Sequence, residues 1–210
     1  MDVRRLTRLM LTLFVAAAPG FSQSMRPEDI AQGSILIMQR DAPDPLFAHS
    51  VIVLAKHEAA GTIGLMIHYR SNIPIERALK GIAGADQRTD PMFVGGPVEL
   101  EGVMGLLRSD VPPPHANPVT GKLYLVASKE GIAGALAEAR KASDVRLFLG
   151  YAGWGPGQLA REVRQGGWWI FPYDESAVFD EHPETLWNRL IKRTELRKAA
   201  LSFSRKASSR

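Results

Sequence analysis

The sequence predicts an α+β fold in one compact domain, with mixed or antiparallel sheets and about four short helices. Two observations favour this class. Short apolar runs rich in β-branched residues dominate the first half of the chain, and amphipathic helical segments separate further strands in the second half. The 210 residues include no cysteine, which excludes disulfides, thiolate nucleophiles and iron–sulfur ligation by this chain.

Three strands are expected in the first half, over residues 34–39, 50–56 and 61–68, with turn residues between them. A helix is expected over residues 74–82, because Ile75, Leu79 and Ile82 fall on one face and Pro74 stands at its start. Strands at residues 92–94 and 101–107 follow. Residues 109–121 contain four prolines and are therefore expected to form a surface loop.

The second half predicts strands at residues 123–127, 145–149 and 168–171. Helices are expected at residues 129–142, 157–165 and 183–194, the first opening near Ser128. In the last helix Leu186, Leu190 and Ile191 are expected to face inward. No linker divides these elements, so one domain over residues 25–194 is expected.

Residues 1–24 have the pattern of a secretory signal peptide. Three arginines precede an uncharged apolar block over residues 9–18, and Ser22 and Ser24 supply small residues before a cut at Met25. The block has about half of the ~20 residues that span a bilayer, and no transmembrane segment is expected after its removal. We therefore expect a periplasmic or secreted protein. The alternative is a translation start at Met25, which would leave the product in the cytoplasm.

The charge of the chain is concentrated at its ends. The formal net charge is +4, from 26 basic and 22 acidic residues. Without residues 1–24 and 192–210, 16 basic and 20 acidic residues remain, so the body of the protein is mildly acidic. Residues 195–210 are expected to be a basic, disordered tail. Specific nucleic-acid binding is not expected from an acidic body.

A glycine-rich segment over residues 150–159 stands between a predicted strand and a predicted helix. Such a turn can aim backbone N–H groups at an anion, with Trp154 as a stacking face. No P-loop or dinucleotide fingerprint is present, so the glycines are also explained by tight packing around one tryptophan. The candidate residues for binding a ligand or partner are Tyr151, Gly153, Trp154, Gly155, Gly157 and Gln158.

Other polar residues give weaker indications of chemistry. Asp44 is expected to form an Asx-type turn with Phe47 buried behind it. His49, His57 and His68 fall at strand ends without the spacing of metal ligands, and the two remaining histidines lie beside prolines. No catalytic residue, metal site or cofactor is predicted. A hydrolase would require Asp44, His49 and His68 to meet in one pocket.

Two adjacent tryptophans, Trp168 and Trp169, occupy a predicted strand and must face opposite sides of it. In one alternative, one ring stays exposed for a partner. In the other, one ring packs in the core and the other lies beneath the carboxy-terminal helix.

Several motifs together resemble the YqgE/AlgH family of bacterial proteins. They are Asp44-Pro45-x-Phe47-x-x-Ser50-Val51, Gly61-x-x-Gly64-Leu65, Gly95-Gly96-Pro97-Val98, residues 150–159, Phe179-Asp180 and Trp187. The resemblance implies mixed sheets bent toward a barrel, with no assigned biochemical role, and one member's name implies transcriptional regulation. This chain departs from the family at His68-Tyr69-Arg70, where an Asn-Lys/Arg-Pro turn is usual, and in its export-like extension.

These observations predict an exported, non-catalytic protein that acts as a binding or accessory module. The expected partner is an unknown protein or a small anionic ligand. The alternatives are a transcriptional regulator, which the acidic body and the lack of a helix-turn-helix pattern disfavour, and a hydrolase.

Overall fold

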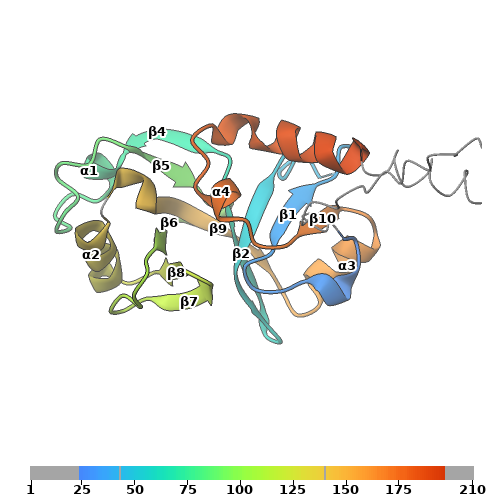
Figure 1. Cartoon of the computed structure of the whole chain (residues 1–210), viewed down its shortest axis with the longest axis horizontal. Helices are drawn as coiled ribbons and strands as arrows, with labels where there is room; N and C mark the ends of the chain where they lie inside the picture. Colours follow the sequence, from blue (N-terminus) through green and yellow to red (C-terminus); the bar gives the residue numbers. More distant parts are fainter. Residues whose placement is uncertain (1–23, 43, 140, 197–210) are drawn as a thin grey trace, which may run out of the picture.

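Ten strands in the described part of the chain form one sheet (Figure 1). The computed structural model describes residues 24–42, 44–139 and 141–196. The strands are β1 (Ile35–Met38), β2 (Val51–Glu58), β3 (Gly61–Met66), β4 (Arg70–Pro74), β5 (Pro91–Val94), β6 (Val98–Arg108), β7 (Asn117–Thr120), β8 (Leu123–Val126), β9 (Val145–Trp154) and β10 (Trp168–Phe171).

The strand order is β10-β1-β2-β3-β9-β6-β8-β7, and a β4–β5 ribbon joins β9 through β5. Neighbouring strands are antiparallel except β5 and β9, which run parallel. The expected α+β class with a mixed sheet is therefore confirmed. The sheet remains open rather than closing into a barrel, because β10 and β7 lie at opposite ends of it.

The helices are short and lie on both faces of the sheet. They are α1 (Ile75–Ala78), α2 (Lys129–Glu138), α3 (Gln158–Arg164) and α4 (Glu175–Val178), with 3-10 turns η1 (Pro27–Asp29), η2 (Ala142–Asp144) and η3 (Pro183–Thr185). After η3, residues 186–196 form one further helix. The Ser128 hydroxyl caps α2 by accepting the Gly131 N–H at 3.0 Å, as expected.

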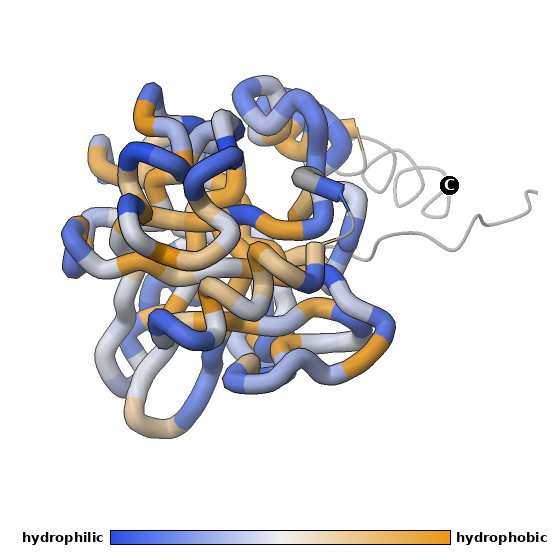
Figure 2. Tube along the Cα trace, turned by 90° about the vertical axis from the view of Figure 1, so that its left-hand side faces the viewer, coloured by the Kyte–Doolittle hydropathy of each residue, from blue (hydrophilic) through white to orange (hydrophobic). Residues whose placement is uncertain are grey.

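Strand β1 is buried on both faces, which explains why its residues are apolar without alternation. Its odd-numbered residues face the core cluster that includes the helix of residues 186–196, and its even-numbered residues face α3. Trp169 and Trp168 divide in the same way, and both are buried. The second of the two alternatives for this pair is therefore confirmed. Figure 2 shows much of the hydrophobic trace in the interior and the hydrophilic stretches mainly along outer loops.

The predicted helix over residues 74–82 was wrong in extent. Strand β4 occupies residues 70–74, and α1 makes a single turn that ends at Ala78. Ile75 and Leu79 are buried as the pattern required. Gly81 has φ of 82°, which is incompatible with a continuing α-helix, and the chain forms turns there. The spacing of apolar residues therefore predicted which side chains are buried but not the length of the helix.

The proline-rich segment was also mispredicted as loop throughout. Residues 117–120 form β7, which pairs with β8 although it contains Pro118. Strand β7 ends the sheet, and the Pro118 carbonyl accepts the Gln32 side-chain N–H at 2.8 Å. The polar backbone groups of this residue therefore face away from β8, where the missing N–H of proline removes no bond between strands. The register shift between Pro118 and Thr120 accommodates this irregular edge.

Strand β9 extends five residues beyond the predicted end at Leu149, through most of the glycine-rich segment. Its second half pairs with β3, where Gly64, Ile63 and Thr62 lie opposite residues 152–154. Its first half pairs with β6 and β5. Gly150 has φ of 65° and lets the strand bend between the two sets of partners.

Gly95 joins the two halves of the sheet at this bend. Its N–H donates to the Leu149 carbonyl at 2.8 Å, and its carbonyl accepts the Met66 N–H at 2.9 Å. A Cβ on Gly95 would lie 2.3 Å from the Gly150 carbonyl oxygen, and a Cβ on Gly150 would lie 2.6 Å from the Gly96 carbonyl oxygen. Only glycine allows the two backbones to approach this closely.

Both ends of the described chain are held by the fold. Ser24 pairs with Ile170 of β10, and the last helix continues to residue 196, where Glu195 lies 3.0 Å from Arg40. The helix thus extends two residues past the predicted start of the tail. The predicted signal peptide, up to residue 23, and residues 197–210 of the predicted tail lie outside the described residues. Within the described part, no helix has the length and apolarity needed to cross a bilayer.

We predict that Gly95→Ala lowers the free energy of unfolding by about 3 kcal/mol, because the new methyl group meets backbone that cannot move aside. Gly134→Ala in α2 is the control, since a Cβ there meets nothing within 4 Å. That control is expected to be neutral or to stabilise by about 0.5–1 kcal/mol. Urea unfolding of both variants measures the difference, and equal effects at the two glycines would contradict the close approach.

Candidate functional site

The six residues predicted to bind a ligand lie at the end of β9 and the start of α3. Tyr151, Gly153 and Trp154 belong to β9, and Gln158 is the first residue of α3. Gly157 precedes α3 with φ of 65°, and the Gly155 N–H donates to the Gln158 side-chain oxygen at 3.1 Å. The predicted anion cradle is not supported at Gly155, because that amide already has a partner. The binding role of these residues stays a prediction.

Trp154 is a core residue, so its ring is not free to act as the stacking face that the binding interpretation of the glycine-rich segment requires. It is 5% exposed and stacks on Phe47, with 6.3 Å between ring centroids. Its ring also meets the edge of Trp168 at 6.0 Å. Phe47 packs against this cluster but is only partly buried, whereas it was predicted to be buried. The Asp44 carboxylate forms the predicted Asx turn by accepting the Leu46 N–H at 2.9 Å.

Gly64 of β3 makes room for the Trp154 ring, since a Cβ there would lie 3.1 Å from it. A Cβ on Gly153, Gly155 or Gly157 would come nearest to other residues, so packing around Trp154 does not explain these three glycines.

Glu162 of α3 is the polar centre of this region, and sequence reasoning missed it. One carboxylate oxygen accepts the indole N–H groups of both Trp154 and Trp168, each at 2.9 Å. The other oxygen accepts the Gln158 side-chain N–H at 2.9 Å. Four-residue spacing from Gln158 to Glu162 on a predicted helix was the available signal. That the two indoles converge on the same oxygen depends on tertiary structure.

A pocket of about 330 Å³ opens beside Glu162, between the chain that follows β1 and the link from α3 to β10. It is lined by Met38, Gln39, Asp41, Ala42, Asp44, Glu162, Gln165, Gly166, Gly167 and Trp168. Three of the described lining residues carry carboxylates, and the described lining contains no Lys or Arg. The pocket therefore presents negative potential beside an indole wall, an arrangement that suits a cationic group on an apolar body.

A second, shallower groove of about 320 Å³ runs beside the β2–β3 hairpin. Tyr151, Gly153 and Trp154 line it together with Val98 and residues of the hairpin tip. The Tyr151 hydroxyl lies 3.4 Å from the Glu99 carboxylate, and partial burial with this charge raises the pKa of Tyr151. Of the six predicted residues, Tyr151, Gly153 and Trp154 line this groove, and Trp154 and Gln158 bond Glu162. Gly155 and Gly157 line neither this groove nor the pocket beside Glu162.

The histidines do not join the acidic pocket. The His49 ring packs on Trp187, with 4.2 Å between centroids, and the His68 ring is held against the backbone of Val51. His57 bonds the Thr62 hydroxyl at 2.7 Å. Asp44 lines the pocket, whereas neither His49 nor His68 does. The arrangement that the hydrolase alternative required is therefore not assembled around this pocket.

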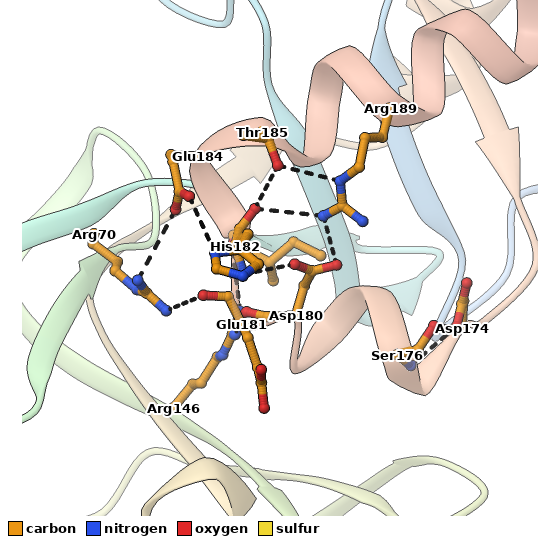
Figure 3. Close-up of polar contacts among 11 residues, drawn as sticks. Arg70, Arg146, Asp174, Ser176, Asp180, Glu181, His182, Glu184, Thr185 and Arg189 are labelled. Atoms are coloured by element: carbon orange, nitrogen blue, oxygen red, sulfur yellow. Dashed lines mark hydrogen bonds and ion pairs between the residues drawn. The ribbon is translucent and has the colours of Figure 1, made fainter.

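A separate cluster of arginines holds the segment before the last helix to the sheet (Figure 3). Arg146 of β9 is 8% exposed and donates to the backbone carbonyls of Ile67 and Asp180. Its guanidinium lies over the Phe93 ring at 4.6 Å, and no described carboxylate forms an ion pair with it. Burial, aided by the charge of Arg70, lowers the pKa of Arg146 to about 10.

Aromatic rings alternate with the guanidinium groups in this cluster. Phe179 lies between Arg108, at 5.0 Å, and Arg146, at 6.0 Å. Phe93 lies between Arg146 and Arg70. Arg70 also donates to the Glu181 carbonyl at 2.8 Å. The position where the sequence departs from the family pattern therefore contributes to docking the carboxy-terminal segment.

The fold and pocket define a single-sheet α+β protein with an acidic pocket beside α3. The chain belongs to the AlgH-like family, whose pattern matches residues 35–199. The resemblance to the YqgE/AlgH family is thereby confirmed.

Relatives cover nearly the same region. A UPF0301 protein of Methylococcus capsulatus is 33% identical over 82% of this chain and 99% of its own length. Another, of Chlorobaculum tepidum, is 32% identical over 79% of this chain and 87% of its own length. The crystal structure of protein DIP2367 from Corynebacterium diphtheriae has a TM-score of 0.66 at 25% identity, covering 78% of this chain and 87% of that one. The solution structure of AlgH from Pseudomonas aeruginosa has a TM-score of 0.64 at 24% identity, covering 85% and 91%.

We predict that Arg146→Lys lowers the free energy of unfolding by about 2 kcal/mol, because an ammonium group cannot serve both carbonyls and both rings. Arg40→Lys is the control, since Arg40 and its partner Glu195 are both about half exposed. Its expected effect is within about 0.5 kcal/mol. Denaturant titration of the two variants measures the contrast, and a loss no larger at Arg146 than at Arg40 would count against the docking role.

We predict that stability falls as the pH drops through 6.5. Burial, with the nearby His49 charge, holds the pKa of His68 below its ordinary value of 6.5. The unfolded chain therefore binds a proton that the folded chain resists, and the native state loses stability as the pH decreases through this window. His68→Gln should flatten the dependence between pH 7.5 and 5.5, whereas His57→Gln, at an exposed site, should keep it. Unfolding free energies at the two pH values provide the measurement.

Proposed function

We propose that this protein is an exported, non-catalytic binding protein, and that its ligand is a small organic cation bearing an ammonium or guanidinium group. The pocket beside Glu162 is the proposed site. The observation that carries the proposal is the fixed Glu162 carboxylate, which three N–H donors from Trp154, Trp168 and Gln158 hold in one orientation. A carboxylate oriented before binding loses little conformational entropy when a cation arrives.

Charge and shape support a cation over the small anion expected from the glycine-rich segment. Asp41 and Asp44 stand at the pocket with Glu162, and the lining includes no basic side chain to attract an anion. Gly166 and Gly167 line the pocket without side chains, which leaves space for a ligand beside the Trp168 ring. An ammonium group near the carboxylate would form charge-assisted hydrogen bonds, while its carbon chain would contact the indole wall.

Support for a binding role also comes from the chemistry of the lining. Its polar side chains are two glutamines and three carboxylates, with no hydroxyl nucleophile or imidazole base among the lining residues. Export is proposed from the signal-like pattern of residues 1–24. Hydrolysis of a compound by pure protein, lost when Asp44 alone is changed, would replace this proposal with the hydrolase alternative.

We predict that agmatine, which carries an ammonium and a guanidinium group, binds at the pocket. Its titration into ¹⁵N-labelled protein should shift the indole N–H signals of Trp154 and Trp168, which bond Glu162, and leave that of Trp169 on the opposite core face. Sodium chloride at equal ionic strength and uncharged 1-butanol are the ligand controls. The proposal fails if agmatine produces no more change than sodium chloride.

Two variants each remove a carboxylate from the pocket, and a control variant removes a carboxylate elsewhere on the surface. Glu162→Gln should weaken agmatine binding by about tenfold, since one charge-assisted contact is lost. Asp44→Asn should weaken it less, because Asn keeps the Asx turn while removing an exposed charge. Glu101→Gln, at an exposed carboxylate of β6 away from the pocket lining, should leave the affinity unchanged. Thermal unfolding of each variant verifies that it remains folded.

A further inference from the structure

We propose that the pocket beside Glu162 selects a primary ammonium group over a guanidinium group, and that the ammonium gives Glu162 a single hydrogen bond. This inference rests on the proposed function, which left the two groups equal, and it narrows the ligand class to alkyl amines. Its basis is the set of hydrogen bonds that the Glu162 carboxylate already accepts from the protein.

Most of the acceptor capacity of the Glu162 carboxylate is already used. An ionised carboxylate has about four positions for hydrogen-bond donors, two on each oxygen. The indole N–H groups of Trp154 and Trp168 both bond Oε2, each at 2.9 Å, and the Gln158 amide bonds Oε1 at 2.9 Å. No other side chain in the described part of the protein donates to this carboxylate. One position therefore remains, and it lies on Oε1.

A guanidinium group makes poor use of one remaining position. Its strength as a carboxylate ligand comes from two parallel N–H groups that bond both oxygens at once. Because the two indoles saturate Oε2, this paired contact requires breaking a bond between Glu162 and a tryptophan. Trp154 and Trp168 are 5% and 1% exposed, so water has little access to an indole N–H that loses its partner.

An ammonium group suits the same position better. It carries three N–H donors that diverge from one nitrogen, so each donor can meet a separate acceptor. One donor fits the remaining position on Oε1 of Glu162. The lining offers further acceptors in the side-chain amides of Gln39 and Gln165. The Gln39 amide nitrogen donates to the Met25 sulfur at 3.5 Å, which leaves its oxygen as the acceptor.

The outer carboxylates of the pocket differ from Glu162 in this respect. Asp41 and Asp44 are both exposed, and the Asp44 carboxylate accepts one N–H, from Leu46 at 2.9 Å. Each Asp44 oxygen thus keeps a position open, so a paired guanidinium contact can form there. A ligand that carries both groups, such as agmatine, is accordingly expected to place its ammonium at Glu162 and its guanidinium at the exposed aspartates.

Stacking on an indole is the one effect that favours a guanidinium group. A guanidinium plane stacks on an aromatic face more readily than an ammonium does, and Trp168 lines the pocket. The Trp168 ring, however, packs against Phe47 and Trp154 and is 1% exposed, so too little of its face is open for a full stacking contact. The contact with Glu162 therefore decides the preference.

The test compares two ligands that differ only in the charged group, n-butylamine and n-butylguanidine, both of which are charged at neutral pH. Each is titrated into the full-length ¹⁵N-labelled protein, and its dissociation constant is taken from the indole N–H signals of Trp154 and Trp168. We expect n-butylamine to bind about tenfold more tightly, since n-butylguanidine lacks its second hydrogen bond to Glu162. Sodium chloride at equal ionic strength is the control for general salt effects.

Gln158→Met tests the cause of the preference. This variant removes the donor on Oε1 of Glu162 and leaves both positions of that oxygen open, so a guanidinium group gains room for two N–H contacts. The preference should fall to about twofold or less, mainly through tighter binding of n-butylguanidine. Glu101→Gln, away from the pocket lining, should keep the preference of the parent chain. Because the Gln158 oxygen also accepts the Gly155 N–H, thermal unfolding verifies that the variant remains folded.

The outcomes separate this inference from the proposed function. If n-butylguanidine binds as tightly as n-butylamine or more tightly, the preference is overturned and the cation site stands. A preference that persists unchanged in Gln158→Met overturns its assignment to the acceptor positions of Glu162. If neither ligand shifts the two indole signals more than sodium chloride does, the proposed function fails together with the inference.

Discussion

The backbones at Gly95 and Gly150 lie so close together that this sheet can form only with glycine at both positions. Here β9 changes partners, from β5 and β6 along its first half to β3 along its second. A side chain on Gly95 would clash with the Gly150 carbonyl, and one on Gly150 would clash with the Gly96 carbonyl. Both positions must therefore be glycine for β9 to pass this close to residues 95 and 96. Because β9 is shared, the clusters under α2 and α3 are placed relative to the same strand.

The acidic pocket follows from this arrangement. Trp154 ends β9 and Trp168 begins β10, and the core packing of both rings aims their indole N–H groups at Glu162. Two apolar residues thereby supply the donors that orient a carboxylate at the surface. The position of the Glu162 carboxylate thus depends on the packing of two core tryptophans. A change in that packing would also change the geometry of the pocket.

On the face of the sheet opposite α3, a buried charged residue, Arg146, holds the carboxy-terminal segment in place. Arg146 donates to the backbone carbonyls of Ile67 and Asp180 and lies over the Phe93 ring, and so ties β9 to the segment that leads into the last helix. That helix in turn covers the face of β1 that α3 does not. The resemblance singled out Phe179-Asp180 as a motif, and the structure gives it a role: the Phe179 ring contacts Arg146 and Arg108, and the Asp180 carbonyl accepts from Arg146.

Local sequence patterns were enough to predict the α+β class, most strands, the Ser128 cap, the Asx turn at Asp44 and the inward faces of the helices. Each of these is local, since periodicity, capping and turn chemistry act over a few neighbouring residues. Four other features result from packing between distant elements: β9 continues past Gly150, β7 forms an edge strand, Trp154 is buried, and Glu162 accepts hydrogen bonds from two indoles. The path of β9 beyond Gly150 depends on β3, about ninety residues earlier in the chain, and the role of Glu162 depends on Trp154 and Trp168 lying on two different strands. No local pattern encodes such contacts.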